Sequence, residues 1–256
     1  MTTEILKEGK SFYYINKEKN FPPDSTTQPV DYNNERNLSL WITQLNATSN
    51  EQNRIINEWI ALLPKLSQLN YLWFQSKVNQ KIFDAVCENH NIESLYIKWS
   101  GIKNIDRITN LTNLKYLHVG SSTQIESLTA LENLKSLEVL EIENTKLIAD
   151  YDFLAKLPNL KALGLTGSMW TTLKINSLAP ISHLENLLWL NLGNTKVLDM
   201  NFNSIHNLKQ LTTLYLPLWY PRKIYQELFK NLPKLKHGEI EKIATDDGYC
   251  KEWKIK

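Results

Sequence analysis

Apolar residues recur along the chain with a fixed spacing, Leu-x2-Leu-x2-Leu-x-Leu, in which Ile or Val often replaces the last leucine. The five regular copies are Leu111, Leu114, Leu117, Val119; Leu134, Leu137, Leu140, Ile142; Leu157, Leu160, Leu163, Leu165; Leu184, Leu187, Leu190, Leu192; and Leu208, Leu211, Leu214, Leu216. Looser copies precede them at Leu66, Leu69, Leu72, Phe74 and at Ile92, Leu95, Ile97, and a degenerate copy follows at Leu232 and Leu235. The segment around each third leucine alternates apolar and polar residues, which predicts a short strand with one buried face.

The third leucines of successive copies lie 22 to 27 residues apart, and this period and internal spacing are the signature of leucine-rich repeats. Between the strands, apolar residues lie three apart, as at Ile102, Ile105 and Ile108, which suits turns of 3-10 helix. Stacked repeats share one continuous core. The predicted fold is therefore an α/β leucine-rich repeat solenoid (horseshoe), with a parallel concave β-sheet of about seven strands and an irregular, 3-10 or helical convex side.

Four segments are predicted along the chain. Residues 1–36 show no repeat and are predicted to be an irregular N-terminal extension. Residues 37–65 are predicted to form an N-terminal cap, with a strand at 38–42 and a helix at 51–63 that Pro64 ends. Residues 66–238 contain the leucine-rich repeats. Residues 239–256 are predicted to form a C-terminal hairpin cap, because Asp247-Gly248 is a strong turn signal, with Trp253 sealing the core.

A second series of residues follows the strands. Three positions after the last core residue of each strand stand Ser100, Ser122, Thr145, Ser168 and Thr195. Hydroxyl groups at such a position can hydrogen-bond backbone groups of the adjacent turn, so these residues are predicted to be structural. The longest repeat has extra residues near 169–177, which are predicted to form a bulged convex loop.

Composition narrows the range of partners. The net charge is +2, from 29 basic and 27 acidic residues, so no broad field attracts nucleic acid. The only cysteines, Cys87 and Cys250, lie far apart in an array of nearest-neighbour contacts, so no disulfide is expected and a reducing compartment is favoured. The first residues lack the apolar stretch of a signal peptide, and no apolar run is long enough to span a bilayer. We expect a cytoplasmic protein that binds neither membrane nor nucleic acid.

No pattern of catalytic residues stands out. The five histidines show no metal-ligand spacing, and neither a phosphate-binding glycine loop nor a nucleophile motif is present. Cys87 lies on the apolar side of the helix predicted at 80–89 and is best explained as a small core residue. We therefore predict a protein without enzymatic activity, cofactor or metal.

The segments LEVLEIENTKL at 137–147 and LLWLNLGNTKV at 187–197 resemble bacterial leucine-rich repeat proteins with internalin-like and SDS22-like repeats of about 22–24 residues. The resemblance covers roughly residues 66–238 and implies a binding scaffold, although a fold does not fix a function. Internalins carry export signals and wall anchors, which are not recognised in this chain. Small stand-alone repeat proteins of this kind also resemble immunity proteins encoded beside bacterial toxins.

The outward-pointing strand residues are the candidate binding surface. Aromatic side chains are frequent there, and Trp and Tyr dominate interface hot spots. The predicted partner-binding residues are Tyr71, Trp73, Tyr96, Lys98, Tyr116, His118, Glu141, Glu143, Trp189 and Tyr215.

These residues are predicted to form two aromatic patches. Between them lie Glu141 and Glu143, beside the small residues Ala162, Gly164 and Gly193, so a partner protein with a basic protruding element is expected. An immunity-type toxin inhibitor is the sharpest hypothesis. An adaptor that positions an enzyme and a ligand- or carbohydrate-sensing protein are the alternatives.

Overall fold

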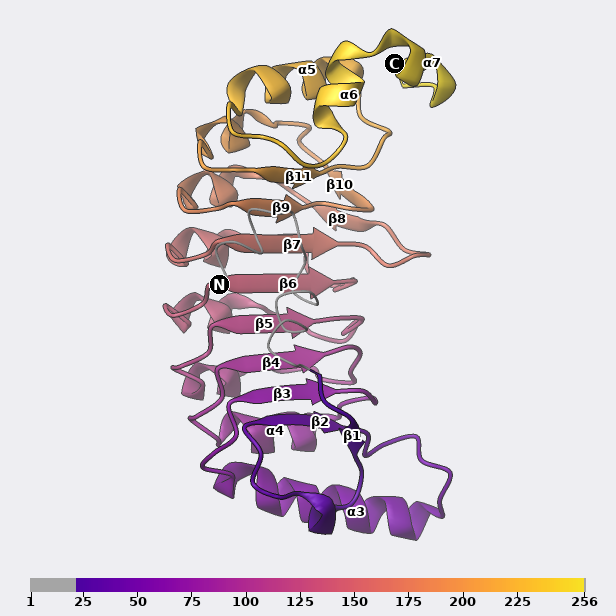
Figure 1. Ribbon diagram of the computed structural model, residues 1–256, viewed down its shortest axis with the longest axis vertical. Coiled ribbons are helices and arrows are strands. Elements are labelled where there is room, and N and C mark those ends of the chain that lie inside the picture. Colours follow the sequence, from indigo (N-terminus) through magenta and orange to yellow (C-terminus); the bar gives the residue numbers. More distant parts are fainter. Residues whose placement is uncertain (1–21, 256) are drawn as a thin grey trace.

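The computed structural model describes residues 22–255. Within this range, nine parallel strands form one sheet in the order β1-β2-β3-β4-β5-β6-β7-β9-β11, and Figure 1 shows them stacked in chain order along the long axis. Their bounds are β1 Ser25–Thr26, β2 Asn37–Leu40, β3 Tyr71–Phe74, β4 Ser94–Ile97, β5 Tyr116–Val119, β6 Val139–Glu143, β7 Ala162–Thr166, β9 Trp189–Asn191 and β11 Thr213–Tyr215. The repeats contribute seven of these, β3 to β11, as predicted.

The register of the sheet aligns the third leucine of every repeat. These residues pair in series across the sheet and are all completely buried: Leu72, Leu95, Leu117, Leu140, Leu163, Leu190 and Leu214. Because each leucine packs between the equivalent residues of its neighbours, the repeats share one continuous core. The sequence prediction of a parallel leucine-rich repeat sheet is confirmed, including which residues of each strand face inward.

The convex side consists mainly of single turns of 3-10 helix. In the repeats these are η3 Asp106–Asn110, η4 Thr129–Asn133, η5 Asp152–Lys156, η6 Ala179–His183 and η7 Asn203–Asn207, and α4 Gln80–Cys87 takes their place in the second repeat. The backbone amide of Ile108 donates to the carbonyl of Ile105 at 2.9 Å, which is the three-residue bond of a 3-10 turn. The apolar residues that lie three apart in the sequence thus predicted these turns correctly.

The N-terminal end of the core is covered by α3 Ser49–Leu62, followed by the short turn η2 Leu63–Lys65. Thr48 caps α3 by accepting a hydrogen bond from the Glu51 amide at 3.2 Å. The buried indole of Trp59 donates to the Thr27 carbonyl at 2.7 Å.

The predicted irregular extension needs correction in its last part. Before β2 lie β1 and the turn η1 Pro29–Asp31, and β1 adds a parallel strand beside β2. Residues 1–21 of that extension lie outside the described residues.

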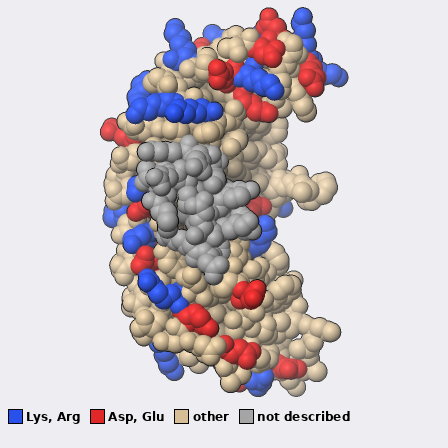
Figure 2. Space-filling model, in the orientation of Figure 1, with Lys and Arg blue, Asp and Glu red and all other residues tan. Residues whose placement is uncertain are grey.

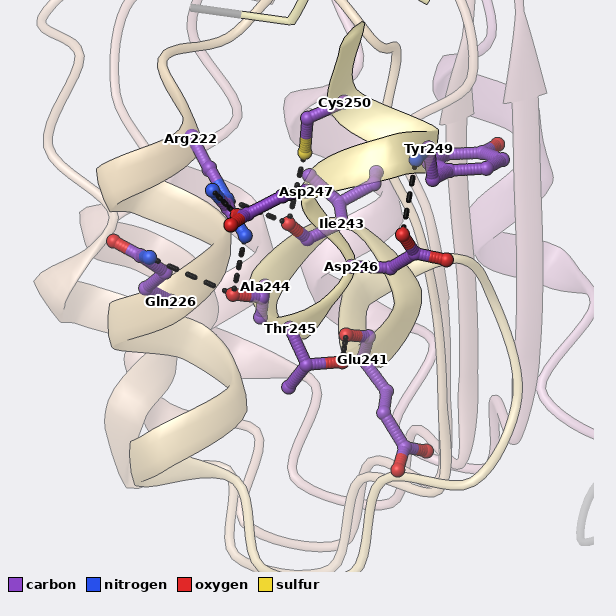
Figure 3. Close-up of polar contacts among 10 residues, drawn as sticks. All are labelled: Arg222, Gln226, Glu241, Ile243, Ala244, Thr245, Asp246, Asp247, Tyr249 and Cys250. Atoms are coloured by element: carbon purple, nitrogen blue, oxygen red, sulfur yellow. Dashed lines mark hydrogen bonds and ion pairs between the residues drawn. The ribbon is translucent and has the colours of Figure 1, made fainter. Parts of the chain in front are cut away.

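The predicted C-terminal hairpin is wrong. Three helices cover this end of the core: α5 Arg222–Asn231, α6 Ile240–Thr245 and α7 Asp247–Glu252. A two-residue hairpin turn of the Asp-Gly type needs positive φ at both central residues, and neither Asp247 nor Gly248 has it. Asp246 instead caps α7 by accepting a hydrogen bond from the Tyr249 amide at 3.0 Å (Figure 3).

Arg222 fixes these helices to one another. Its guanidinium donates to the carbonyls of Ile243 and Ala244 at 3.0 and 3.2 Å and forms an ion pair with Asp247 (Figure 3). Carbonyls at the end of α6 are satisfied in this way, which a helix end requires. Trp253, predicted to seal the core, is 54% exposed because α7 ends before it.

The hydroxyl series is a structural ladder, as predicted. The hydroxyls of Ser100 and Ser122 lie 2.7 Å apart, and the buried Thr195 hydroxyl donates to the Leu165 carbonyl at 2.6 Å. Thr145 bonds the Tyr151 hydroxyl at 3.2 Å, and Ser168, which is half-buried, accepts from the Thr171 amide at 3.0 Å.

The extra residues of the longest repeat do not form a simple convex bulge. They include β8 Leu173–Ile175, which pairs in parallel with β10 Thr195–Val197 as a separate two-stranded sheet. The loop between β7 and β8 projects beyond the carboxyl ends of the main strands (Figure 1).

Candidate functional site

The outward face of the sheet carries a second apolar cluster, separate from the core. Its buried members come one each from six neighbouring strands and are Trp73, Tyr96, Tyr116, Val139, Ala162 and Trp189, with Tyr71 and Leu188 packed against them. Strand geometry explains this separation, because residues beside the core leucines point to the opposite face. We call this cluster, together with the neighbouring residues of the same face, the concave band.

One row of the concave band is a stack of rings that ends in a contact between an imidazole and a carboxylate. Trp73 and Tyr96 stack with ring centroids 3.4 Å apart, and Tyr96 and His118 stack at 4.1 Å. The His118 Nδ1 atom lies 3.0 Å from a carboxylate oxygen of Glu141. Trp73, Tyr96, His118 and Glu141 are directly paired across β3 to β6, so the parallel register creates the stack.

Trp189 extends the band toward the C-terminal repeats. A Cβ atom at Gly164 would lie 3.6 Å from the Trp189 ring and 3.2 Å from the Glu141 side chain. Glycine at this position therefore lets the indole ring approach the sheet beside Glu141. Trp189 also meets Tyr215 edge to face, with ring centroids 6.3 Å apart. The two aromatic patches expected from the sequence are thus joined into one band.

The exposure of the band differs from the sequence prediction. Trp73, Tyr96, Tyr116, His118 and Trp189 are only 2 to 8% exposed, although the prediction placed them on an open surface. Trp73, Tyr96 and His118 stack on one another, and alternation alone does not reveal such contacts between rings.

The remaining predicted residues form a more accessible rim. Lys98 and Tyr215 are exposed, whereas Tyr71, Glu141 and Glu143 are half-buried. The structure therefore brings all ten predicted residues onto one face but divides them into buried rings and a rim.

Charges at the amino ends of the strands are largely neutralised. Lys115 pairs with Glu93 at 3.1 Å and Lys161 pairs with Glu138 at 2.9 Å, between neighbouring strands. The hydrogen bond to Glu93 raises the pKa of Lys115. On the concave face, Glu141 is engaged by His118, so the predicted acidic centre presents mainly Glu143 to a basic partner.

Groups that might support chemistry have structural explanations. Among residues 22–255, no group of three or more His, Cys, Asp or Glu side chains is arranged to hold a metal ion. Cys87 and Cys250 are free and buried, and burial raises the pKa of the Cys87 thiol. None of the helices in this range has the length and apolar character needed to cross a bilayer.

Sequence reasoning missed an exposed apolar region at the carboxyl ends of the strands. Trp170 and Met169, in the loop between β7 and β8, are 89% and 84% exposed. The available signal was the extra length of this repeat together with the adjacent Met-Trp pair, because an apolar insertion in a surface loop is unusual.

Comparison with known proteins supports the fold. No family model matches the sequence, and no curated protein matches it significantly. The crystal structure of an internalin C2 from Listeria monocytogenes aligns over 70% of this chain and 72% of its own, with 24% identity and a TM-score of 0.51. An internalin (inlF) structure from the same organism aligns over 68% of each chain, with 18% identity and a TM-score of 0.39. The chain thus has a leucine-rich repeat fold, similar to that of the internalin C2 structure.

Proposed function

We propose that this chain is a non-enzymatic protein-binding module that holds a partner protein against its concave band. The observation that carries the proposal is the second apolar cluster, which six side chains build on the face opposite the core. A sheet needs one apolar face to fold, so a second aromatic face requires another explanation. Trp and Tyr are the residue types that contribute most to protein interfaces.

The buried rings and the more exposed rim residues of the band would have different roles in binding. The stacked rings of Trp73, Tyr96 and His118 form a rigid base, and a rigid surface loses little conformational entropy when it binds. The rim residues Lys98, Glu143 and Tyr215 would then make the direct contacts with the partner protein. The rim carries both a base and an acid, so the partner must present complementary charges around an apolar centre.

Seven repeat strands at about 4.8 Å give a sheet roughly 30 Å across, enough for an interface of about 800 Å² per partner. This size favours a protein over a small ligand. Carbohydrate binding would use an open aromatic ring, whereas Trp73 and Trp189 are 5% and 2% exposed. The two free buried cysteines support a reducing compartment, and we propose the cytoplasm.

The test begins with affinity purification of the tagged chain from its native cell and identification of co-purifying proteins by mass spectrometry. The recovered partner is then titrated with wild type, Tyr215→Ala, Lys98→Glu and Glu143→Lys, with the convex variant Lys81→Glu as the charge-matched control. We expect Tyr215→Ala to weaken binding by about 2 kcal/mol and the charge variants mainly to change the association rate.

The proposal is contradicted if all three rim variants bind the partner normally while the convex variant Lys81→Glu loses affinity for it. If the partner is an enzyme, its activity in the complex separates the two finer hypotheses. Inhibition supports an immunity-type inhibitor, and full activity supports an adaptor.

A further inference from the structure

The carboxyl ends of strands β6 to β11 carry a concentration of exposed apolar side chains, which we call the strand-end edge. Six of the ten exposed large apolar residues among residues 22–255 lie there: Leu147, Met169, Trp170, Leu198, Met200 and Trp219. Their exposed fractions run from 43% at Met200 to 89% at Trp170. Single exposed apolar residues are ordinary, but a cluster of this kind marks an interaction site.

The most exposed residues are held on a well-anchored loop. The Ser168 hydroxyl accepts hydrogen bonds from the amides of Trp170 and Thr171 at 3.3 and 3.0 Å. The side-chain amide of Asn194 donates to the carbonyls of Ser168 and Thr171 at 2.6 and 3.2 Å. Trp170 therefore stands on a fixed turn, so its contact with a partner costs little ordering entropy.

Beside this loop, two surface depressions lie next to each other and share Thr172. Lys146, Lys174 and Leu198 help to line the first, and Lys196, Met200 and Trp219 help to line the second. Basic and apolar groups thus alternate along the same edge. Figure 2 shows basic side chains beside the projection on this side of the molecule.

The three lysines have no acidic partner among the described residues. Lys174 and Lys196 are directly opposite in the β8–β10 pair, and like charges in this position destabilise a sheet. By contrast, Lys115 and Lys161 at the other end of the strands are both paired.

Two acids near the strand-end edge already accept hydrogen bonds from asparagine residues. Asp150 accepts a hydrogen bond from the Asn176 side chain at 2.7 Å, and Asp199 accepts from the Asn201 amide at 2.9 Å. Neither acid forms an ion pair with Lys146, Lys174 or Lys196.

We propose that the strand-end edge binds an acidic segment of a partner protein that also carries apolar side chains. Its acids would pair with Lys146, Lys174 and Lys196, and its apolar residues would fill the two depressions beside Trp170. A flat bilayer cannot enter such depressions, so the geometry favours a polypeptide over a lipid surface. This inference is independent of the concave band and stands even if that proposal fails.

The test selects short peptides from a displayed random library on the full wild-type chain. The enriched sequence is synthesised with a fluorescent label and titrated by anisotropy against wild type and two variants. One variant combines Lys146→Glu, Lys174→Glu and Lys196→Glu, and the other combines Met169→Ser and Trp170→Ser. The charge-matched control combines Lys65→Glu, Lys81→Glu and Lys103→Glu, which are exposed lysines elsewhere. Circular dichroism verifies that each variant is folded.

We expect the enriched peptides to combine acidic and apolar residues. Each strand-end variant should bind at least about tenfold more weakly, whereas the control should bind within about twofold of wild type. Enrichment of basic or purely apolar peptides, or unchanged binding by both strand-end variants, overturns the proposal. So does a strand-end-dependent sedimentation with phosphatidylserine vesicles in the absence of peptide binding, because the edge would then recognise a lipid surface.

Discussion

Truncation of Trp189 tests whether the side chains of the concave band contribute to the stability of the folded chain. The indole is 2% exposed and packs beside Ala162 and Gly164, which offer few atoms that could move into the space it leaves. Truncation of a buried tryptophan typically costs about 3–5 kcal/mol, and poor relaxation places this site in the upper half of that range. For a chain of this size, a loss of about 4 kcal/mol corresponds to roughly 8–16 °C in melting temperature.

The measurement is urea unfolding of the full chain, followed by circular dichroism, for wild type, Trp189→Ala and Trp189→Phe. The phenylalanine variant keeps most of the ring and removes the indole N–H, which is buried and has no hydrogen-bond partner among residues 22–255. An unsatisfied buried donor costs about 1–3 kcal/mol, so its removal offsets much of the lost packing. Trp189→Phe should therefore remain within about 1 kcal/mol of wild type.

A loss below about 1 kcal/mol for Trp189→Ala would refute this reasoning, because the side chain would then contribute no more than a surface residue. Trp170→Ala is the matched surface control. Its ring is 89% exposed, so its removal should change stability by no more than about 0.5 kcal/mol.

Three further outcomes follow from the structure. Leu163→Ala should cost about 2–5 kcal/mol in the same unfolding assay, because the side chain is completely buried between Leu140 and Leu190, and a cost below about 1 kcal/mol would contradict the shared core. In a low-salt gel shift, nucleic acid should not bind tightly, since the net charge is +2, and tight salt-sensitive binding would contradict this. Burial raises the pKa of the Cys87 thiol, so a thiol reagent should react with it only after unfolding. The unfolded chain ionises this thiol at a lower pH than the folded chain does. The free energy of unfolding should therefore fall as the pH rises above the ordinary pKa of a cysteine thiol. Rapid labelling of the native protein at Cys87 would contradict the burial of this thiol.

The solenoid can be predicted from the sequence because the spacing of apolar residues within each repeat indicates where its strand and its turn lie. The leucine spacing predicted which strand residues face inward, and the pairing of Leu140, Leu163 and Leu190 confirms it. The positions of Ser100, Ser122 and Thr195 likewise predicted a hydrogen-bonded ladder. These features depend on local periodicity, which a single sequence contains.

Features that depend on contacts between elements could not be predicted in this way. Alternation placed Trp73 and Trp189 on the outer face, but the stacking of Trp73 on Tyr96 and the close approach of Trp189 to Gly164 are contacts between repeats. Asp247-Gly248 suggested a hairpin because the local signal is the same for a turn and for the first residues of a capped helix. Contacts of Arg222 with α6 and α7 are made between separate elements and leave no periodic pattern.

Side-chain footprinting by hydroxyl radicals, with and without the recovered partner, tests the concave-band proposal most directly. Tyr215 and Tyr71, which are exposed and half-buried in the chain alone, should lose reactivity in the complex, and the oxidation of Trp253 at the far end of α7 should stay unchanged. Unchanged reactivity at both tyrosines in a saturated complex would contradict the proposal that the partner binds this face.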